Sequence, residues 1–273
     1  MMFESKKNTF VLGVGAPKTG TTWLYSYLKE SKHSNLGCLK EYHVWDAKFI
    51  GLCDRYNEKL SRFWRRRFSF VRYLMQNYQG FYEYYFKSLV AGSENITADI
   101  TPAYCGLSVS NLSMLKAKLE QAGFDVKVVF LMRDPVDRCW SATRMRIRTL
   151  TEKGEVIVDS SGANQIFKES FSSDIYEFRT RYENTVKNLN QVFSPSDIYY
   201  GVYEEMFEPC NIEKLSRFLG VEFSPEYARI MKNVSPNDAV LDDELIEKCK
   251  SYYSETYAFC NEEFPQTRTL WRS

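Results

Sequence analysis

The amino-acid sequence predicts an α/β protein with a central parallel β-sheet flanked by helices on both faces. Four short runs rich in β-branched and aromatic residues are typical of buried strands, and helical patterns lie between them. The predicted strands are Thr9–Gly15, Asn95–Ile100, Val126–Met132 and Asp197–Tyr203. Because strands that alternate with helices form parallel sheets, we expect ligands to bind at the carboxyl ends of these strands.

Hydrophobic spacing and capping residues predict the helices. Leu112, Leu115 and Leu119 recur on one helical face. Asp134 is a good N-cap ahead of Pro135, which suits the first position of a helix. The predicted helices span Ser110–Leu119, begin at Pro135, and span Asp174–Val192, Asn211–Leu219 and Asp242–Phe259.

The chain of 273 residues has no internal repeat, no low-complexity tract and no Pro/Gly/Ser-rich linker. This predicts a single domain over residues 1–273. Two segments fit the alternating pattern less well. Residues 55–90 are helical and dense in aromatic residues and arginine, and residues 149–172 lack clear periodicity. We expect both to be helical insertions near the substrate.

The composition indicates a globular protein whose charges balance. Hydrophobic residues make up 44% of the chain, and 36 basic against 35 acidic residues leave a formal net charge of +1. A protein that coats nucleic acid needs a basic surface, so this balance argues against a nucleic-acid partner. Any recognition of an anion must therefore be local.

Seven cysteines form no CxxC pair and no metal-ligand spacing, and their odd number leaves one unpaired in any disulfide scheme. Reduced thiols in a cytoplasm-like compartment follow from this pattern. No apolar stretch before the first predicted strand is long enough for a signal peptide or a membrane anchor. We therefore expect a cytoplasmic protein with no membrane span and no bound metal.

The first predicted strand enters a loop of small residues and a helical pattern leaves it, in the stretch LGVGAPKTGTTWLYSYL. Small residues from Gly13 to Gly20 let backbone N–H groups approach an anion, and the helix that begins at Thr21 adds the positive end of its dipole. Lys18, Thr21 and Thr22 add side-chain donors. In the triphosphate-binding pattern GxxxxGK[ST] the lysine follows the last glycine, whereas Lys18 stands inside the loop. We interpret the stretch as a P-loop-type anion site, and an ordinary glycine-rich turn is the alternative.

A second polar pair follows the third predicted strand, in the stretch RDPVDRCWS. Arg133 stands at the carboxyl end of the strand, and Ser141 lies two helical turns beyond Asp134 on the same face. An arginine fork and a hydroxyl can hold one phosphate from two sides. Alone, this motif would equally fit an arginine paired with Asp134 or Asp137. Together with the loop, it favours phosphate binding.

The loop GAPKTGTTWL resembles the 5′-phosphosulfate-binding loop, PK[ST]GTT[WL], of sulfotransferases that use 3′-phosphoadenosine 5′-phosphosulfate (PAPS). In that family the lysine reaches the oxygen that bridges phosphate and sulfate, and RDPVDRCWS is similar to the family's 3′-phosphate-binding element. The resemblance implies that the donor is bound by Pro17, Lys18, Thr19, Gly20, Thr21, Thr22, Trp23, Arg133 and Ser141. It also implies PAPS as the donor and 3′-phosphoadenosine 5′-phosphate (PAP) as the product.

Two further stretches resemble the branch of the family that includes heparan sulfate and several bacterial sulfotransferases. LKEYHVWD is similar to the KExxFFD-like stretch of that branch, which implies Glu41 as general base, and His43 is the alternative base. ADITPAY is similar to the E[KA][ST]PxY segment and implies that Thr101 and Tyr104 line the acceptor cleft. Asp99 stands where the family often has lysine or alanine, which weakens any catalytic role for it.

Two positions concern the adenosine end of the donor. The KG-containing loop of the family has no clear counterpart, and KNVSPND at Lys232–Asp238 lies about where that loop should be. Trp23 matches the tryptophan that stacks on adenine in the cytosolic branch of the family. A tryptophan of the helix core is the alternative for Trp23.

The resemblance implies sulfuryl transfer without a metal. Lys18 would neutralise the leaving phosphate, Glu41 or His43 would accept the acceptor's proton, and the acceptor would offer a hydroxyl or an amine on a glycan, a lipid or polyketide, or a small metabolite. A P-loop nucleotide kinase or NTPase is one alternative. A non-catalytic module that binds acidic ligands is the other, with the basic and aromatic run Arg62–Arg72 as its patch.

Overall fold

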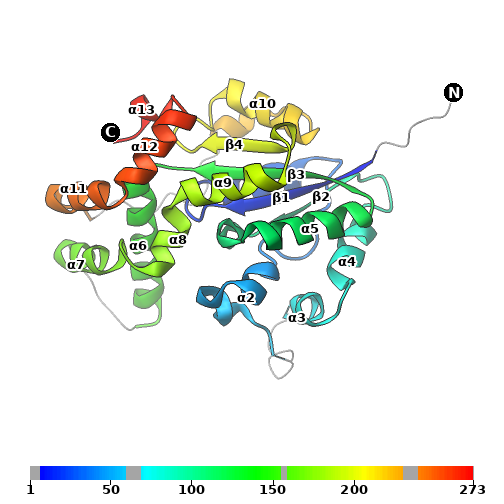
Figure 1. Ribbon diagram of the computed structural model, residues 1–273, viewed down its shortest axis with the longest axis horizontal. Coiled ribbons are helices and arrows are strands. Elements are labelled where there is room, and N and C mark those ends of the chain that lie inside the picture. Colours follow the sequence, from blue (N-terminus) through cyan, green and yellow to red (C-terminus); the bar gives the residue numbers. More distant parts are fainter. Residues whose placement is uncertain (1–6, 60–68, 155–158, 230–238, 273) are drawn as a thin grey trace.

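A four-stranded parallel sheet in the order β2-β1-β3-β4 forms the centre of the computed structural model (Figure 1). The structure describes residues 7–59, 69–154, 159–229 and 239–272. The strands are β1 (Asn8–Gly15), β2 (Ile96–Ile100), β3 (Phe124–Met132) and β4 (Ile198–Val202). All four predicted strands are confirmed, with shifts of one or two residues at their ends.

Helices cover the sheet and continue beyond it. The α-helices are α1 (Thr21–Glu30), α2 (Trp45–Phe49), α3 (Ser69–Asn77), α4 (Phe81–Leu89), α5 (Val109–Gln121), α6 (Pro135–Glu152), α7 (Ser160–Ser170), α8 (Asp174–Thr180), α9 (Tyr182–Val192), α10 (Pro209–Leu219), α11 (Asp243–Tyr252), α12 (Ser254–Glu263) and α13 (Thr267–Leu270). Short 3-10 helices include η1 (Gly51–Tyr56), η3 (Pro102–Gly106), η4 (Pro195–Asp197) and η5 (Pro225–Arg229). The predicted α/β class is confirmed.

Alternate residues of the central strands serve two apolar cores, one on each face of the sheet. On β3, Phe130 belongs to one core, whereas Val129 and Leu131 belong to the other. This alternation follows from the two-residue period of a strand. The first core is packed by α4, α5 and α9 among others, and the second by α1 and α10. Both faces of the sheet are therefore buried, as a parallel sheet requires.

Two long helical predictions each correspond to two helices. Asp174–Val192 is interrupted at Arg181, whose ψ of 74° lies outside the helical range and separates α8 from α9. Asp242–Phe259 is interrupted at Tyr253, which is fully buried and donates a hydrogen bond to the carbonyl of Phe171 (2.5 Å). In both places the apolar spacing continues through the break, so the sequence predicted one helix where the structure has two.

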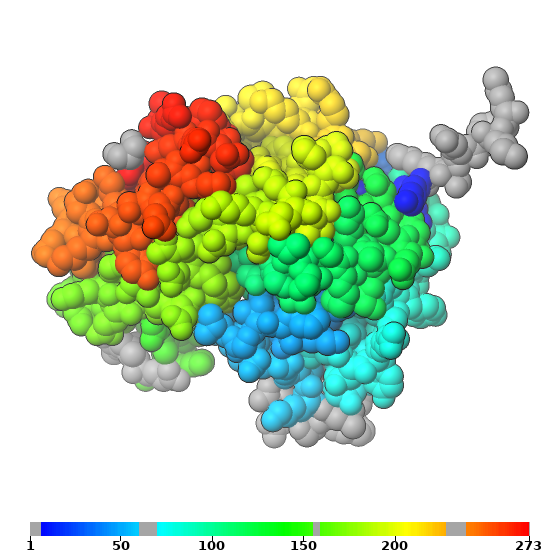
Figure 2. Space-filling model, in the orientation of Figure 1, coloured from blue at the N-terminus to red at the C-terminus, as the bar shows by residue number. Residues whose placement is uncertain are grey.

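The two segments that fitted the pattern poorly are partly helical. Within residues 55–90 the structure describes the end of η1 and the helices α3 and α4, and within 149–172 it describes the end of α6 and then α7. Figures 1 and 2 show that the chain around α2 packs directly beside α5 on the same face of the molecule. This arrangement brings the segment that follows Lys40 to the sheet edge where β1 and β3 end.

Candidate active site

The loop between β1 and α1 has the geometry of an anion cradle. Lys18 has φ of 75° and Gly20 has φ of 94°, and a Cβ on Gly20 would lie 2.7 Å from the sulfur of Met206. Glycine is therefore required at this turn. Thr19 Oγ1 donates to the carbonyl of Ala16 (2.6 Å) and closes the loop. The N-cap of α1 is Gly20, so no capping side chain occupies the first backbone N–H groups of the helix, which are the groups that bind anions at helix N-termini.

One cavity of about 400 Å³ lies beside this loop at the carboxyl ends of β1 and β3. Its described lining residues are Pro17, Lys18, Gly20, Thr21, Thr22, Trp23, Lys40, Glu41, His43, Arg55, Tyr56, Pro102, Ala103, Arg133, Ser141, Met145, Arg148, Arg179 and Tyr203. Three motifs that are far apart in the sequence meet here. They are the loop around Lys18, the pair Arg133 and Ser141, and the stretch that contains Glu41.

The part of the cavity around Lys18 and Arg133 is strongly positive. Burial lowers the pKa of Lys18 to about 8, and the nearby cations Arg148, Arg133, Arg144 and Lys40 lower it further in that order. The guanidinium of Arg133 lies 4.4 Å from the centre of the Tyr203 ring. Its Nε has no hydrogen-bond partner among the described residues. Such a site favours a ligand with several negative charges.

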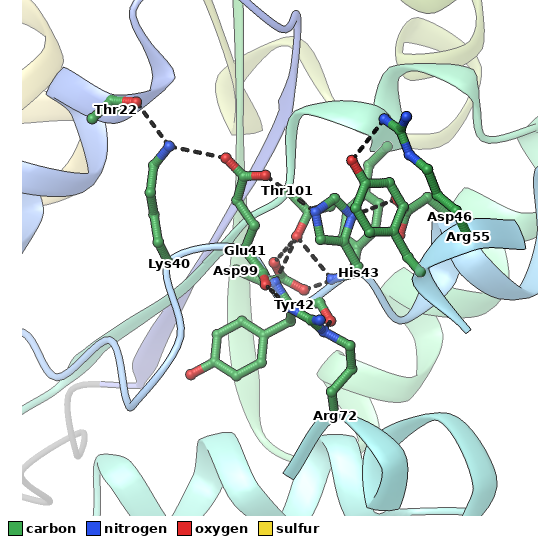
Figure 3. A network of polar contacts seen from close by, with 12 residues as sticks. Thr22, Lys40, Glu41, Tyr42, His43, Asp46, Arg55, Arg72, Asp99 and Thr101 are labelled. Atoms are coloured by element: carbon green, nitrogen blue, oxygen red, sulfur yellow. Dashed lines mark hydrogen bonds and ion pairs between the residues drawn. The ribbon is translucent and has the colours of Figure 1, made fainter. Parts of the chain in front are cut away.

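A chain of polar contacts runs from α1 across the floor of the cavity (Figure 3). Lys40 Nζ donates to Thr22 Oγ1 (2.7 Å) and contacts Glu41 Oε1 (2.9 Å). Glu41 Oε2 lies 3.1 Å from His43 Nε2, and His43 Nδ1 lies 2.7 Å from Asp46 Oδ2. His43 thus stands between two carboxylates, and both of its ring nitrogens are occupied.

These contacts shift the pKa values of Glu41 and His43 in opposite directions. Burial raises the pKa of Glu41, but the hydrogen bond from His43 and the charge and hydrogen bond of Lys40 outweigh it and bring the pKa to about 2. Burial lowers the pKa of His43, but hydrogen bonds to Asp46 and Glu41 outweigh it and raise the pKa above its ordinary value. Glu41 is therefore ionised at neutral pH, and protonation of His43 is favoured.

Helix α3 holds the backbone of the Glu41–His43 loop. Arg72 donates to the carbonyls of Tyr42 (2.8 Å) and Glu41 (2.9 Å), and Gln76 donates to the carbonyl of His43 (2.6 Å). His43 has φ of 51°, a conformation that an ordinary residue seldom adopts without support. Two side chains from α3 therefore fix the loop that carries the ionised carboxylate.

Comparisons with known proteins identify the family of this chain. The family model "Sulfotransferase domain" matches residues 8–251. The chain belongs to this family. A search of curated proteins finds no match to it.

Solved structures of sulfotransferases share the fold. A sulfotransferase from Alicyclobacillus acidocaldarius aligns with a TM-score of 0.59 and 18% identity over 94% of this chain and 95% of that chain. Mouse sulfotransferase SULT7A1, solved as a complex with PAP, aligns with a TM-score of 0.50 and 14% identity over 98% of this chain and 88% of that chain. At these identities the likeness shows the fold alone.

Two residues that we expected to line the acceptor cleft of this sulfotransferase lie beneath the cavity. Thr101 and Tyr104 are buried, and their hydroxyls donate to the carboxylate of Asp99 (2.6 and 2.8 Å). Thr101 Oγ1 also accepts the backbone N–H of Tyr42 (3.0 Å). Burial raises the pKa of Asp99 to about 6 against the lowering effect of these hydrogen bonds. Thr101 and Tyr104 support the loop from below because the turn after β2 directs them into the core.

Trp23 lies at the edge of the cavity, and most of its ring is in the second core. Its side chain is buried, stacks on Tyr27 with ring centroids 5.0 Å apart, and donates from Nε1 to the carbonyl of Tyr227 (3.1 Å). Thr19, predicted as a donor contact, is fully buried and does not line the cavity. Its role in the described structure is to close the loop.

The sequence predictions missed several cavity residues. Five residues that line the cavity were not predicted as site residues: Lys40, Arg55, Tyr56, Arg148 and Arg179. Of these, only Lys40 belongs to a recognised motif, KEYHVWD. Only the contact of Lys40 with Thr22 and Glu41 distinguishes it from a surface lysine. The three arginines belong to η1, α6 and α8, and they line one cavity only because these elements come together in the fold.

The remaining predictions concern a metal site, a membrane span and two further stretches of the sequence. Within the described residues, no group of three or more His, Cys, Asp or Glu side chains could hold a metal ion. No helix in the ranges that the structure describes is long and apolar enough to cross a membrane. The stretch Lys232–Asp238 and most of the basic run Arg62–Arg72 lie outside the described residues.

Proposed function

We propose that this member of the sulfotransferase family transfers a sulfuryl group from PAPS to a hydroxyl or an amine of an acceptor. The observation that carries the proposal is that one cavity is lined both by the anion-binding groups of Lys18, Arg133 and Ser141 and by the carboxylate of Glu41, which is ionised. Anion-binding groups and a carboxylate base are the two parts that this reaction needs. The mouse relative that was solved with PAP adds support for the donor.

In the proposed reaction, the loop and α1 hold the 5′-phosphosulfate, and Arg133 with Ser141 holds the 3′-phosphate. The acceptor oxygen or nitrogen attacks sulfur, the bond from sulfur to the bridging phosphate oxygen breaks, and PAP leaves. Lys18 stabilises the negative charge that develops on that oxygen. Because transfer of this kind has a loose transition state, positioning and charge supply most of the catalysis.

Glu41 is the better candidate for the base. Its carboxylate is ionised, lines the cavity and is 31% exposed, so it can accept the acceptor's proton. Both ring nitrogens of His43 are engaged by carboxylates, its ring stacks on Tyr56 with centroids 3.6 Å apart, and its raised pKa favours the protonated form. We therefore assign His43 and Asp46 the task of orienting Glu41.

The acceptor class stays open among glycans, lipids or polyketides, and small metabolites. A cytoplasmic setting suits the reaction, since all seven cysteines are free in the structure. A kinase or NTPase is disfavoured, because Lys18 does not occupy the lysine position of the triphosphate pattern and β3 is followed directly by Arg133.

Ligand-dependent thermal unfolding tests the proposal. We expect PAP to stabilise the protein, by about 2.7 kcal/mol when its concentration is 100 times its dissociation constant. ATP with Mg²⁺ at the same concentration serves as the comparison and should stabilise less. Protection by ATP with Mg²⁺ and none by PAP would refute the sulfotransferase proposal and favour the kinase alternative.

A further inference from the structure

The cavity is far more positive than the chain as a whole. Its described lining contains six cationic side chains and one carboxylate, that of Glu41, whereas the whole chain has a formal net charge of only +1. The six cations are Lys18, Lys40, Arg55, Arg133, Arg148 and Arg179. The proposed donor contacts use Lys18 and Arg133, and Lys40 is paired with Glu41. Three arginines remain without an assigned role.

One of these arginines, Arg55, lies on the side of Glu41 away from Thr22 of α1. Figure 3 shows Thr22 of α1 and Arg55 of η1 on opposite sides of the Glu41 carboxylate. A continuous set of contacts joins Glu41 to Arg55. Glu41 contacts His43, His43 stacks on Tyr56, and Arg55 Nη2 donates to the Tyr56 hydroxyl (3.0 Å). Arg55 is therefore connected to the proposed base through Tyr56 and His43, and it lines the same cavity.

Arg179 of α8 lies in the same part of the cavity as Arg55. The buried thiol of Cys53 lies in the field of both arginines: burial raises its pKa, and the positive charges of the arginines act to lower it. Arg55 and Arg179 form no ion pair with any described carboxylate, and the Nε of Arg179 is buried without a partner in the described part of the chain. Two guanidinium groups that line one cavity without a carboxylate partner favour the binding of an anion there.

We propose that the acceptor carries an oxyanion group, a carboxylate, sulfate or phosphate, which Arg55 and Arg179 bind while its hydroxyl or amine faces Glu41. This inference rests on the proposed function and narrows its acceptor. Planar guanidinium groups are well suited to bind an oxyanion through paired hydrogen bonds. Arg55 lies on the side of Glu41 opposite Thr22, which belongs to the proposed donor contacts.

Equilibrium binding to the PAP-saturated protein tests this proposal with three matched probes. The probes are 4-(hydroxymethyl)benzoate, 4-(hydroxymethyl)phenyl sulfate and the methyl ester of the benzoate, measured by calorimetry at pH 7. We expect at least one anionic probe to bind about 10 to 100 times more tightly than the neutral ester, the range of one charge-assisted hydrogen bond. The two anionic probes distinguish a carboxylate site from a sulfate-type site.

Variants of Arg55 and Arg179 test whether these side chains cause the preference for the anionic probe. Arg55→Met and Arg179→Met should each remove most of the preference for the anion and leave the affinity for PAP unchanged. Arg217→Met, an exposed arginine on α10 that pairs with Glu213, is the matched control and should keep the preference. Arg179→Lys retains the charge if the methionine variant does not fold.

Three results would overturn the inference. They are equal binding of the acid and the ester, no binding of any probe to the PAP-saturated protein, and a loss of PAP affinity in the Arg55 and Arg179 variants as large as the loss for the anion. A protein that does not bind PAP at all would instead contradict the proposed function. The two failures are therefore distinguishable.

Discussion

The two walls of the cavity are built in different ways. On the donor wall, the anion loop is shaped by its own backbone: Lys18 and Gly20 adopt positive φ, and Thr19 closes the turn with a hydrogen bond to Ala16. On the proposed acceptor wall, Glu41 is held by side chains: His43 of the same loop contacts its carboxylate, and Arg72 of the distant helix α3 donates to its backbone carbonyl. A locally determined wall tolerates changes elsewhere, whereas a network of side chains depends on each member.

Glu41→Gln is expected to give the largest difference between an effect on kcat and an effect on PAP affinity. The amide cannot accept the acceptor's proton, so kcat should fall about 10²- to 10⁴-fold, the usual contribution of a general base. The affinity for PAP, measured by calorimetry, should stay the same because the donor wall is intact. Glu213→Gln on the exposed face of α10 is the control. A fully active Glu41→Gln variant would show that another group is the general base.

A smaller effect is expected for Arg72→Met, which removes two donors to the Glu41–His43 loop and an ion pair with Glu58. A displacement of about 1 Å can cost roughly 10²-fold in rate, so kcat should fall about 10- to 100-fold. PAP affinity should again be unchanged. Steady-state kinetics and calorimetry on the same preparation make the comparison, and equal losses in kcat and PAP affinity would mean that the two walls are not independent.

The smallest effect concerns the pH dependence of donor binding. The pKa of Lys18 is lowered to about 8, so the free enzyme loses this positive charge as the pH rises through 8. PAP affinity should therefore fall above pH 8, by at most about tenfold per pH unit. Calorimetry at pH 7, 8 and 9 measures this change.

Lys18→Arg provides the control for the pH experiment. Arginine keeps its charge over this range, so the variant should bind PAP with little change between pH 7 and 9. The same decline in both proteins would assign the titration to another group. Glu41, with a pKa of about 2, stays ionised from pH 5 to 9 and should contribute no acidic limb there.

The difference between the walls also explains which predictions succeeded. The strands and the anion loop were predicted from short stretches, because a strand's period and a glycine-rich turn are properties of neighbouring residues. The helix breaks at Arg181 and Tyr253 were missed. The side chains at both breaks donate hydrogen bonds to residues that are distant in the sequence, Glu255 and Phe171, and local spacing does not encode these contacts. Thr101 and Tyr104 were expected at the acceptor but support the loop from the core.

The sequence by itself determined the class of fold, the anion loop with Lys18, and the candidates Glu41, Arg133 and Ser141. These depend on local geometry and on residue types with few alternative uses. Only the tertiary structure decided which side chains meet. Arg55 and Arg179 are separated by more than a hundred positions in the chain and share one thiol neighbour and one cavity. Such pairing arises from the packing of η1 and α8, and no local pattern encodes it.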